Sequence, residues 1–233
     1  MTTSDWGLAV AGAVLLAGYG WHAARTDSPA LDLTLVRDPA TALSVGLCAL
    51  ASVVTWAAVF LLPVFAQSVQ GHSALAAGVA MAPQGLVTGV STALSRNLRL
   101  PVRSMTGTGF AVLAVASLGI LAIGVATPLW VIAVILAVRS VSIGLVINPL
   151  LTAVTGRQGA SPDATTLFNV VQRVAGSFGI GLLAALYSGL ARSSGPVAAL
   201  HVTALVIAGI AAAGALGSRL LPGGQSTVRA TSA

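Results

Sequence analysis

The sequence predicts an all-α, polytopic membrane protein with about seven transmembrane helices. The chain of 233 residues is 56% hydrophobic and only 7% charged, whereas a soluble domain carries about 25% charged residues. Its apolar runs are long enough to cross the hydrocarbon core, which takes about 20 residues. These runs are too long and too continuous for barrel strands, and a helix satisfies its own backbone polar groups in lipid.

The apolar runs divide the chain into an extra helix, a linker, a bundle and a tail. Residues 1–24 hold the extra transmembrane helix and 25–41 form a cytoplasmic linker, in which two X-Pro pairs predict an extended or turning chain with a short surface helix between them. Residues 42–221 form a six-helix bundle, and the polar, Gly-rich residues 222–233 form a tail that we expect to be disordered. The expected spans are residues 6–24, 42–66, 74–95, 105–125, 129–151, 165–190 and 199–221.

Arginine placement predicts how the spans are oriented. Connections that contain arginine alternate along the chain with those at 67–73 and 126–128, which contain none, and with one that contains only Arg192. Arginine collects on the cytoplasmic side of a membrane. We therefore expect a plasma or inner cell membrane location, with the amino terminus outside and the carboxyl terminus in the cytoplasm. Three of the bundle's spans precede Thr127-Pro128 and three follow it, which fits the inverted repeat of many transporter halves.

The ionisable residues exclude several classes of function. All 11 basic residues are arginine and all 5 acids are aspartate, so the chain cannot form a P-loop lysine, a His-Glu-x-x-His zinc site or a Schiff-base lysine. We predict no enzymatic activity, no cofactor and no metal site. The net charge of +6 reflects orientation in the bilayer, and we expect no nucleic-acid partner. Cys48, the only cysteine, is expected to be a small core residue.

Two arginines lie inside the spans, and no carboxylate does. Asp163 is placed to cap the amino end of the sixth span. Because none of the aspartates lies inside a span, this chain has no acid that could carry a proton within the membrane. Arg139 and Arg173 are candidates for function or for pairing between helices, because a charge near mid-membrane costs at least about 2.5 kcal/mol. The alternative is that each side chain snorkels to the interface, which is natural for Arg173, about two turns into its span.

Helical periodicity predicts the two faces of the sixth span. We expect its polar face to turn into the bundle, on the side that a missing half would cover, and its apolar face to meet lipid. The polar face holds Thr166, Asn169, Arg173, Gly176 and Ser177, and the apolar face holds Leu167, Val171, Val174, Phe178 and Leu182. Glycines in several spans predict close helix packing: Gly85, Gly89, Gly176, Gly179, Gly181, Gly209, Gly214 and Gly217.

Four motifs follow one another along the chain. The first, residues 28–33, reads Ser-Pro-Ala-Leu-Asp-Leu, and the second, residues 61–85, is the turn between the second and third spans. The third, residues 139–149, begins with Arg139 and contains Asn148, and the fourth, residues 169–179, contains Asn169, Gln172 and Arg173. The polar, Gly and Pro residues of the turn motif are Gln67, Gly71, Ser73, Pro83, Gln84 and Gly85.

In this order the motifs resemble those of the multidrug antiporters in the fourteen-helix branch of the major facilitator superfamily. The resemblance covers nearly the whole chain, as the eighth helix and the last six of that family. It implies the carboxyl-terminal portion of an efflux transporter for small, amphipathic compounds, proton-coupled in the intact family and incomplete on its own. The candidate substrate or coupling residues are then Arg139, Asn148, Asn169, Gln172 and Arg173.

Two departures from the family limit what the chain does alone. The amino-terminal bundle, which carries the family's principal proton-coupling acid, has no counterpart here, and residues 95–104 lack the Asp of the superfamily's gating loop. The expected partners are the lipid bilayer and, if an amino-terminal half completes the chain, a small-molecule substrate. The alternative function is a non-transporting membrane protein that binds or regulates a partner.

Overall fold

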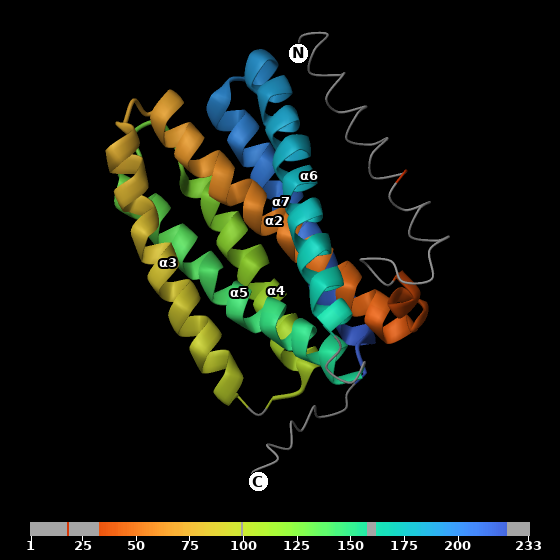
Figure 1. Cartoon of the computed structure of the whole chain (residues 1–233). Coiled ribbons are helices and arrows are strands. Elements are labelled where there is room, and N and C mark those ends of the chain that lie inside the picture. Colours follow the sequence, from red (N-terminus) through yellow and green to blue (C-terminus); the bar gives the residue numbers. More distant parts are fainter. Residues whose placement is uncertain (1–17, 19–32, 99, 158–161, 223–233) are drawn as a thin grey trace.

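The structure is a computed structural model in which residues 18, 33–98, 100–157 and 162–222 are described. Figure 1 shows these residues as a bundle of helices. The elements are η1 (Leu33–Arg37), α2 (Pro39–Ser68), α3 (Ala74–Asn97), α4 (Val102–Leu118), η2 (Gly119–Ala122), α5 (Leu129–Arg157), α6 (Pro162–Ser194), α7 (Pro196–Gly217) and η3 (Ser218–Leu220).

Six helices within the described ranges are long and apolar enough to cross a membrane, one for each expected span of the bundle. The all-α membrane fold is thereby confirmed, and η1 is the short helix expected in the linker. The extra helix at 6–24, the linker's first residues and the tail from residue 223 onward lie outside the described residues. The fourth expected span, at 105–125, is shorter as an α-helix than expected and continues as the 3₁₀ turn η2.

Polar caps and prolines set where the helices begin. The Asp38 carboxylate accepts hydrogen bonds from the backbone N and the hydroxyl of Thr41 at 3.0 and 2.8 Å, which starts α2 at Pro39. The Ser73 hydroxyl accepts from the Ala76 N–H at 3.2 Å and starts α3. Asp163 is not the cap that we expected, because α6 already begins at Pro162 and places it in the first turn. A carboxylate there still stabilises the helix through its dipole.

The second helix of each half of the bundle packs against the first helix of the other half. Counting α2 to α4 as one triplet and α5 to α7 as the other, α3 packs mainly on α5, and α6 packs mainly on α2. The third helices, α4 and α7, pack on each other, and α2 contacts α5. Figure 1 shows α3 and α6 on opposite sides of the bundle with α2 and α5 between them. This reciprocal packing supports the inverted repeat inferred from the sequence.

Glycines permit the closest of these helix contacts. A Cβ at Gly144 of α5 would lie 2.5 Å from the Ser91 carbonyl group of α3, and a Cβ at Gly179 of α6 would lie 2.6 Å from the Val53 Cα of α2. Gly214 of α7 is equally tight against the ring of Phe110. Our packing prediction was wrong for Gly85, Gly89, Gly181 and Gly209, because no atom of another described element lies within 4 Å of the position of their Cβ.

The buried side chains form two apolar layers. One layer, with Phe110, Leu150 and Phe168, also contains the fully buried Cys48, as expected for a small core residue. The other, with Phe65 and Leu136, lies nearer the α2–α3 turn. α3 and α6 contribute least to either layer, because only 11% and 22% of their most apolar 18-residue windows are buried, against 44–56% in the other four spans.

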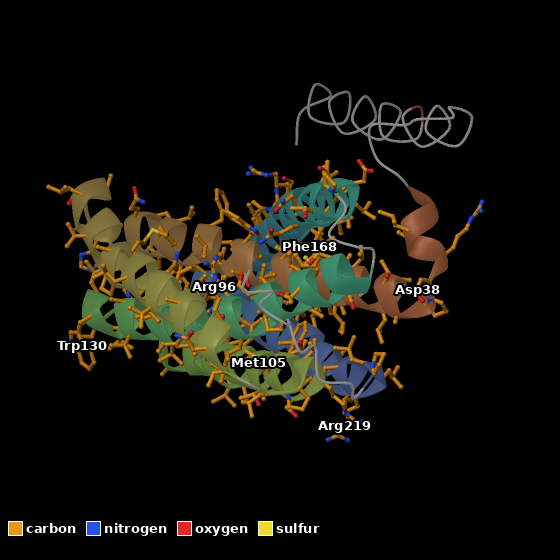
Figure 2. All side chains as sticks on the ribbon, turned by 60° about the horizontal axis from the view of Figure 1, so that its bottom comes forward. Asp38, Arg96, Met105, Trp130, Phe168 and Arg219 are labelled. Carbon is orange, nitrogen blue, oxygen red and sulfur yellow. The ribbon has the colours of Figure 1, made fainter. Side chains whose placement is uncertain are left out.

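The ends of the bundle differ in arginine content. Because successive spans alternate in direction, Arg37, Arg96, Arg103 and Arg219 lie toward one end of the bundle, and Arg192 lies toward the other. In Figure 2, Trp130 lies at the opposite end of the molecule from Asp38 and Arg219. In the described part of the chain, the connections that contain several arginines therefore lie at one end of the bundle, and those with few or none lie at the other.

Candidate functional site

Arg139 is buried at the centre of the bundle and joins three helices. It lies on α5, and only 3% of its surface is exposed. Its Nη2 donates a hydrogen bond to the Val54 carbonyl of α2 at 2.9 Å, and its Nη1 donates to the Ser117 hydroxyl of α4. Ser117 accepts this bond while donating to the Leu113 carbonyl of its own helix. Arg139 thus makes the contact between helices that was one of its two expected roles.

No carboxylate balances the buried charge of Arg139 from within the spans. The chain has no acidic residue between Asp38 and Asp163 or after Asp163, and Asp163 lies in the first turn of α6. The guanidinium is therefore held by neutral acceptors, a backbone carbonyl and a hydroxyl. Its Nε–H has no hydrogen-bond partner among the residues described. Such a group is costly to bury, so its position is not explained by stability alone.

Asn148 lies on the same helix as Arg139, and its side chain contacts α3. Its Nδ2 donates to the Ser95 hydroxyl of α3 at 3.2 Å, and the Ser91 hydroxyl donates to the Ser140 carbonyl at 3.3 Å. Both bonds cross the α3–α5 contact in which Gly144 brings the two backbones together. Asn148 therefore helps to hold α3 on α5, and its side chain is half-buried.

The polar face of α6 is exposed on the surface of the described bundle. Thr166, Asn169, Arg173 and Ser177 are all exposed, and Gln172 beside them is half-buried. The hydroxyls of Thr166 and Ser177 bond carbonyls of their own helix, those of Pro162 and Arg173, each at 3.0 Å. Asn169 and Arg173 are thus exposed on the described bundle, and their expected position on the side that a missing half would cover stays a prediction.

The apolar face of α6 is only partly free of protein contacts. Phe178 and Leu182 are 61% and 69% exposed, as expected of side chains that meet lipid. Leu167 is only 2% exposed and Val171 packs against the core, so the part of this face near the amino end of α6 is buried. The reason is that α6 packs on α2 and α7, and the apolar side chains of its first turns supply that contact.

An apolar stripe on α2 lies next to this polar face, and sequence reasoning missed it. Trp56, Phe60 and Val64 are spaced four residues apart on one face of α2, and they are 45%, 45% and 36% exposed. Trp56 contacts α6 at Gly176, where an added Cβ would lie 2.5 Å from the ring atom Cδ1. The i, i+4 spacing of two aromatic residues was the signal in the sequence.

The turn motif forms the connection between α2 and α3. Gly71 has a φ of +74°, which glycine adopts readily, and Ser73 caps α3. Gln67 donates only to the Pro63 carbonyl of its own helix, at 3.2 Å. Pro83, Gln84 and Gly85 lie within α3, where Gly85 is exposed and the Gln84 Oε1 is buried without a hydrogen-bond partner among described residues.

Gln70, which was not among the candidates, links two turns of the bundle. Its Nε2 donates to the carbonyls of Gly124 and Thr127, at 2.8 and 3.0 Å, in the α4–α5 connection. His201 of α7 bonds the neighbouring Ile123 carbonyl through Nε2 at 2.9 Å. Hydrogen bonds between turns therefore hold together the end of the bundle that carries few arginines. Neither Arg139, on α5, nor Arg173, on α6, takes part in these bonds.

Comparison with known proteins bears directly on this fold. The chain is 24% identical over 183 residues to an uncharacterized MFS-type transporter, YhcA, of Bacillus subtilis, in a match that covers 77% of this chain and 34% of that protein. It is 25% identical over 195 residues to the lincomycin resistance protein LmrB of Listeria monocytogenes, covering 79% of this chain and 41% of LmrB. The LmrB of Listeria innocua is 24% identical over the same length. No protein-family model matches.

The resemblance to the major facilitator superfamily is confirmed. The chain has the helices of half of a transporter of that type, and it is a multi-pass membrane protein. It spans between 34% and 41% of the length of the curated relatives it matches. YhcA is a transporter by name and LmrB a lincomycin resistance protein, which supports the transporter function that the motif resemblance implies.

Proposed function

We propose that this chain is the carboxyl-terminal portion of a multidrug-type efflux transporter and works together with an amino-terminal bundle. The carrying observation is the unequal coverage of its helices. α3 and α6, the second helices of the two triplets, are far less buried than the other four spans. A second bundle laid across these two helices would cover them and would enclose a path for an amphipathic compound between the two halves.

The exposed charge of α6 supports the same arrangement. Arg173 and Asn169 would face hydrocarbon if the described bundle stood alone in a membrane, which is costly for a charge and for an amide. Covering the polar face with protein or with a water-filled path removes that cost. The relatives support it as well, because their length leaves room for a further bundle.

Proton coupling and membrane orientation belong to this proposal. Since no acid lies in the interior of the six described spans, the coupling acid would come from the amino-terminal bundle. The arginine-rich end would face the cytoplasm of a plasma or inner membrane. Cysteines at the exposed positions Arg96 and Ser194, in a Cys48→Ala background, are then expected to react with an impermeant reagent from opposite sides, and only Ser194→Cys from outside.

The proposal is tested by drug resistance in an efflux-deficient host. We expect no resistance from the chain alone and resistance to amphipathic drugs when it is produced together with an amino-terminal bundle. Gly144→Leu is the matched inactive variant, because its side chain cannot fit against the Ser91 backbone. Gly209→Leu, at an open and exposed position on α7, which is not one of the two helices that the second bundle would cover, controls for the added bulk.

Two outcomes contradict the proposal. Energy-dependent efflux by the purified chain in proteoliposomes would show that no second bundle is needed. A stable complex with another membrane protein, without any transport by that complex, would instead support the alternative of a non-transporting protein that regulates a partner.

A further inference from the structure

We propose that the face shared by α2 and α6 binds amphipathic molecules that carry an anionic head group, and discriminates against matched cations. This inference names the substrate class and therefore rests on the proposed function. The face consists of two stripes, which we call the apolar stripe (Trp56, Phe60, Val64) and the polar stripe (Asn169, Arg173, Ser177). Each stripe repeats every four residues, so each lies along one side of its helix.

The two stripes are neighbours in the fold. α6 packs mainly on α2, and Gly176 lets the Trp56 ring approach the α6 backbone. Gly176 lies on the same side of α6 as Arg173, less than one helical turn further along. The Trp56 end of the apolar stripe therefore meets α6 beside the part of the polar stripe that holds Arg173 and Ser177. This pairing of surfaces matches a molecule with an apolar body and a polar head.

The charge of the face has one sign. Arg173 is its charged side chain, and no acidic residue lies in the chain between Asp38 and Asp163 or beyond Asp163. The part of the chain that is described offers the Arg173 guanidinium no hydrogen bond or ion pair. An anionic head group can therefore accept hydrogen bonds from a donor that is unused among the described residues, whereas the charge of Arg173 repels a cationic head group.

Arg173 lies at a depth where such a contact is strong. α6 has 33 residues and is therefore about 50 Å long, so its midpoint is near residue 178. Arg173 lies five residues, about 8 Å, from that point, within the roughly 15 Å half-thickness of the hydrocarbon core if α6 is centred in the membrane. Water screens charges much less at this depth than at the protein surface.

Arg139 cannot perform this role. Its guanidinium is buried among α2, α4 and α5 and already donates to Val54 and Ser117. A ligand would have to separate packed helices to reach it. Arg192 cannot perform it either, because it lies in the last turn of α6, more than five turns beyond Arg173. Arg192 is exposed and therefore serves as the matched control.

Fluorescence quenching of Trp56 tests the inference on the full chain. The protein, with Trp6, Trp21 and Trp130 replaced by Phe, is placed in zwitterionic lipid nanodiscs. It is titrated with a spin-labelled fatty acid and with a spin-labelled quaternary ammonium of equal chain length, each corrected for its partition into the lipid. We expect the fatty acid to quench Trp56 at about tenfold lower mole fraction, as one hydrogen bond to a charged group provides. A protein that keeps only Trp130 should show no such preference.

Substitutions assign the preference to Arg173. Arg173→Gln should abolish it, whereas Arg173→Lys should retain most of it and Arg192→Gln all of it. Equal helical content and thermal unfolding of these variants by circular dichroism establish that they are folded. Equal quenching by the two probes in the unaltered chain, or a preference that survives Arg173→Gln, would overturn the inference.

A third arm separates a transported compound from a lipid. Adding phosphatidylglycerol to the nanodiscs should leave the preference in place, and its loss would overturn the assignment in favour of a lipid head-group site. Resistance upon co-production without any preference for anions would remove this inference and leave the proposed function standing. A preference for the anionic probe without resistance upon co-production would contradict the proposed function and leave this inference standing.

Discussion

Arg139 and Arg173 both lie inside apolar spans, yet the structure places them in opposite surroundings. Arg139 is on α5, which packs against α2, α3 and α4, and neutral acceptors from two of these helices hold its guanidinium. Arg173 is on α6, which packs mainly on α2 and α7, and its side chain is exposed. The covered interior and the uncovered face therefore differ in how many helices surround a side chain.

The difference teaches what each arginine can do. A guanidinium that already donates to two helices stabilises a particular arrangement of those helices, and it is poorly placed to bind anything else. A guanidinium without a partner within the described chain is available to a ligand or to a second bundle. Substitutions of the same kind at a covered and an uncovered position therefore test the comparison directly.

The largest effect is expected from Arg139→Ala. It removes two hydrogen bonds between helices and leaves a cavity at the centre of the bundle, so we expect the free energy of unfolding to fall by about 3 kcal/mol or more. Arg173→Ala should change it by less than about 0.5 kcal/mol, because its side chain is exposed. Unfolding in detergent, followed by circular dichroism, measures both.

Arg139→Met separates the cavity from the charge. Methionine fills much of the volume and removes the cost of a buried cation, so the loss should shrink to within about 1.5 kcal/mol. If Arg139→Ala is tolerated as well as Arg173→Ala, the two arginines do not differ in the way that we describe.

Glycine substitutions should give the next largest effects. A Cβ at Gly144 or Gly179 meets the backbone of a neighbouring helix at 2.5 or 2.6 Å, and a backbone cannot move aside as a side chain can. We expect Gly144→Ala and Gly179→Ala each to lower the free energy of unfolding by about 1–3 kcal/mol. The same detergent unfolding experiment measures the change.

Gly85→Ala and Gly181→Ala are the matched changes on uncovered faces. Neither Cβ would meet an atom within 4 Å, and alanine is the better helix former, so both should be neutral or stabilising by up to about 1 kcal/mol. A loss at Gly85 similar to that at Gly144 would mean that α3 is covered in the isolated chain.

The number and order of the spans could be predicted because hydrophobic length is a local property. Span starts were less accurate: the expected starts at 42, 165 and 199 are found at Pro39, Pro162 and Pro196. Each helix begins at a proline, whose fixed φ suits the first turn, before the apolar residues that we used to detect it. Hydropathy alone does not detect a helix start that is set by a proline.

Which face of a span is covered could not be predicted, because it depends on the neighbouring helices. Periodicity grouped Leu167 with Phe178, but α6 buries the first and exposes the second. The positions of Arg139 and Asn148 required the tertiary contacts of α5 with α2, α3 and α4. Gln70 was overlooked because its bonds reach residues 54 and 57 positions away in the sequence.

The smallest effect is expected at the turns, where Gln70 is covered and Gln67 is not. Gln70→Ala removes two hydrogen bonds, of 2.8 and 3.0 Å, to the α4–α5 connection, so the free energy of unfolding should fall by about 1–2 kcal/mol. Gln70→Glu should cost more, because a carboxylate would face two carbonyl oxygens without a proton to share. Gln67→Ala, which removes one exposed bond within α2, should cost less than about 0.5 kcal/mol. Amide hydrogen exchange in residues 123–128 measures the opening of this connection directly, and equal exchange in the Gln70→Ala and Gln67→Ala proteins would show that the bond between the turns does not form.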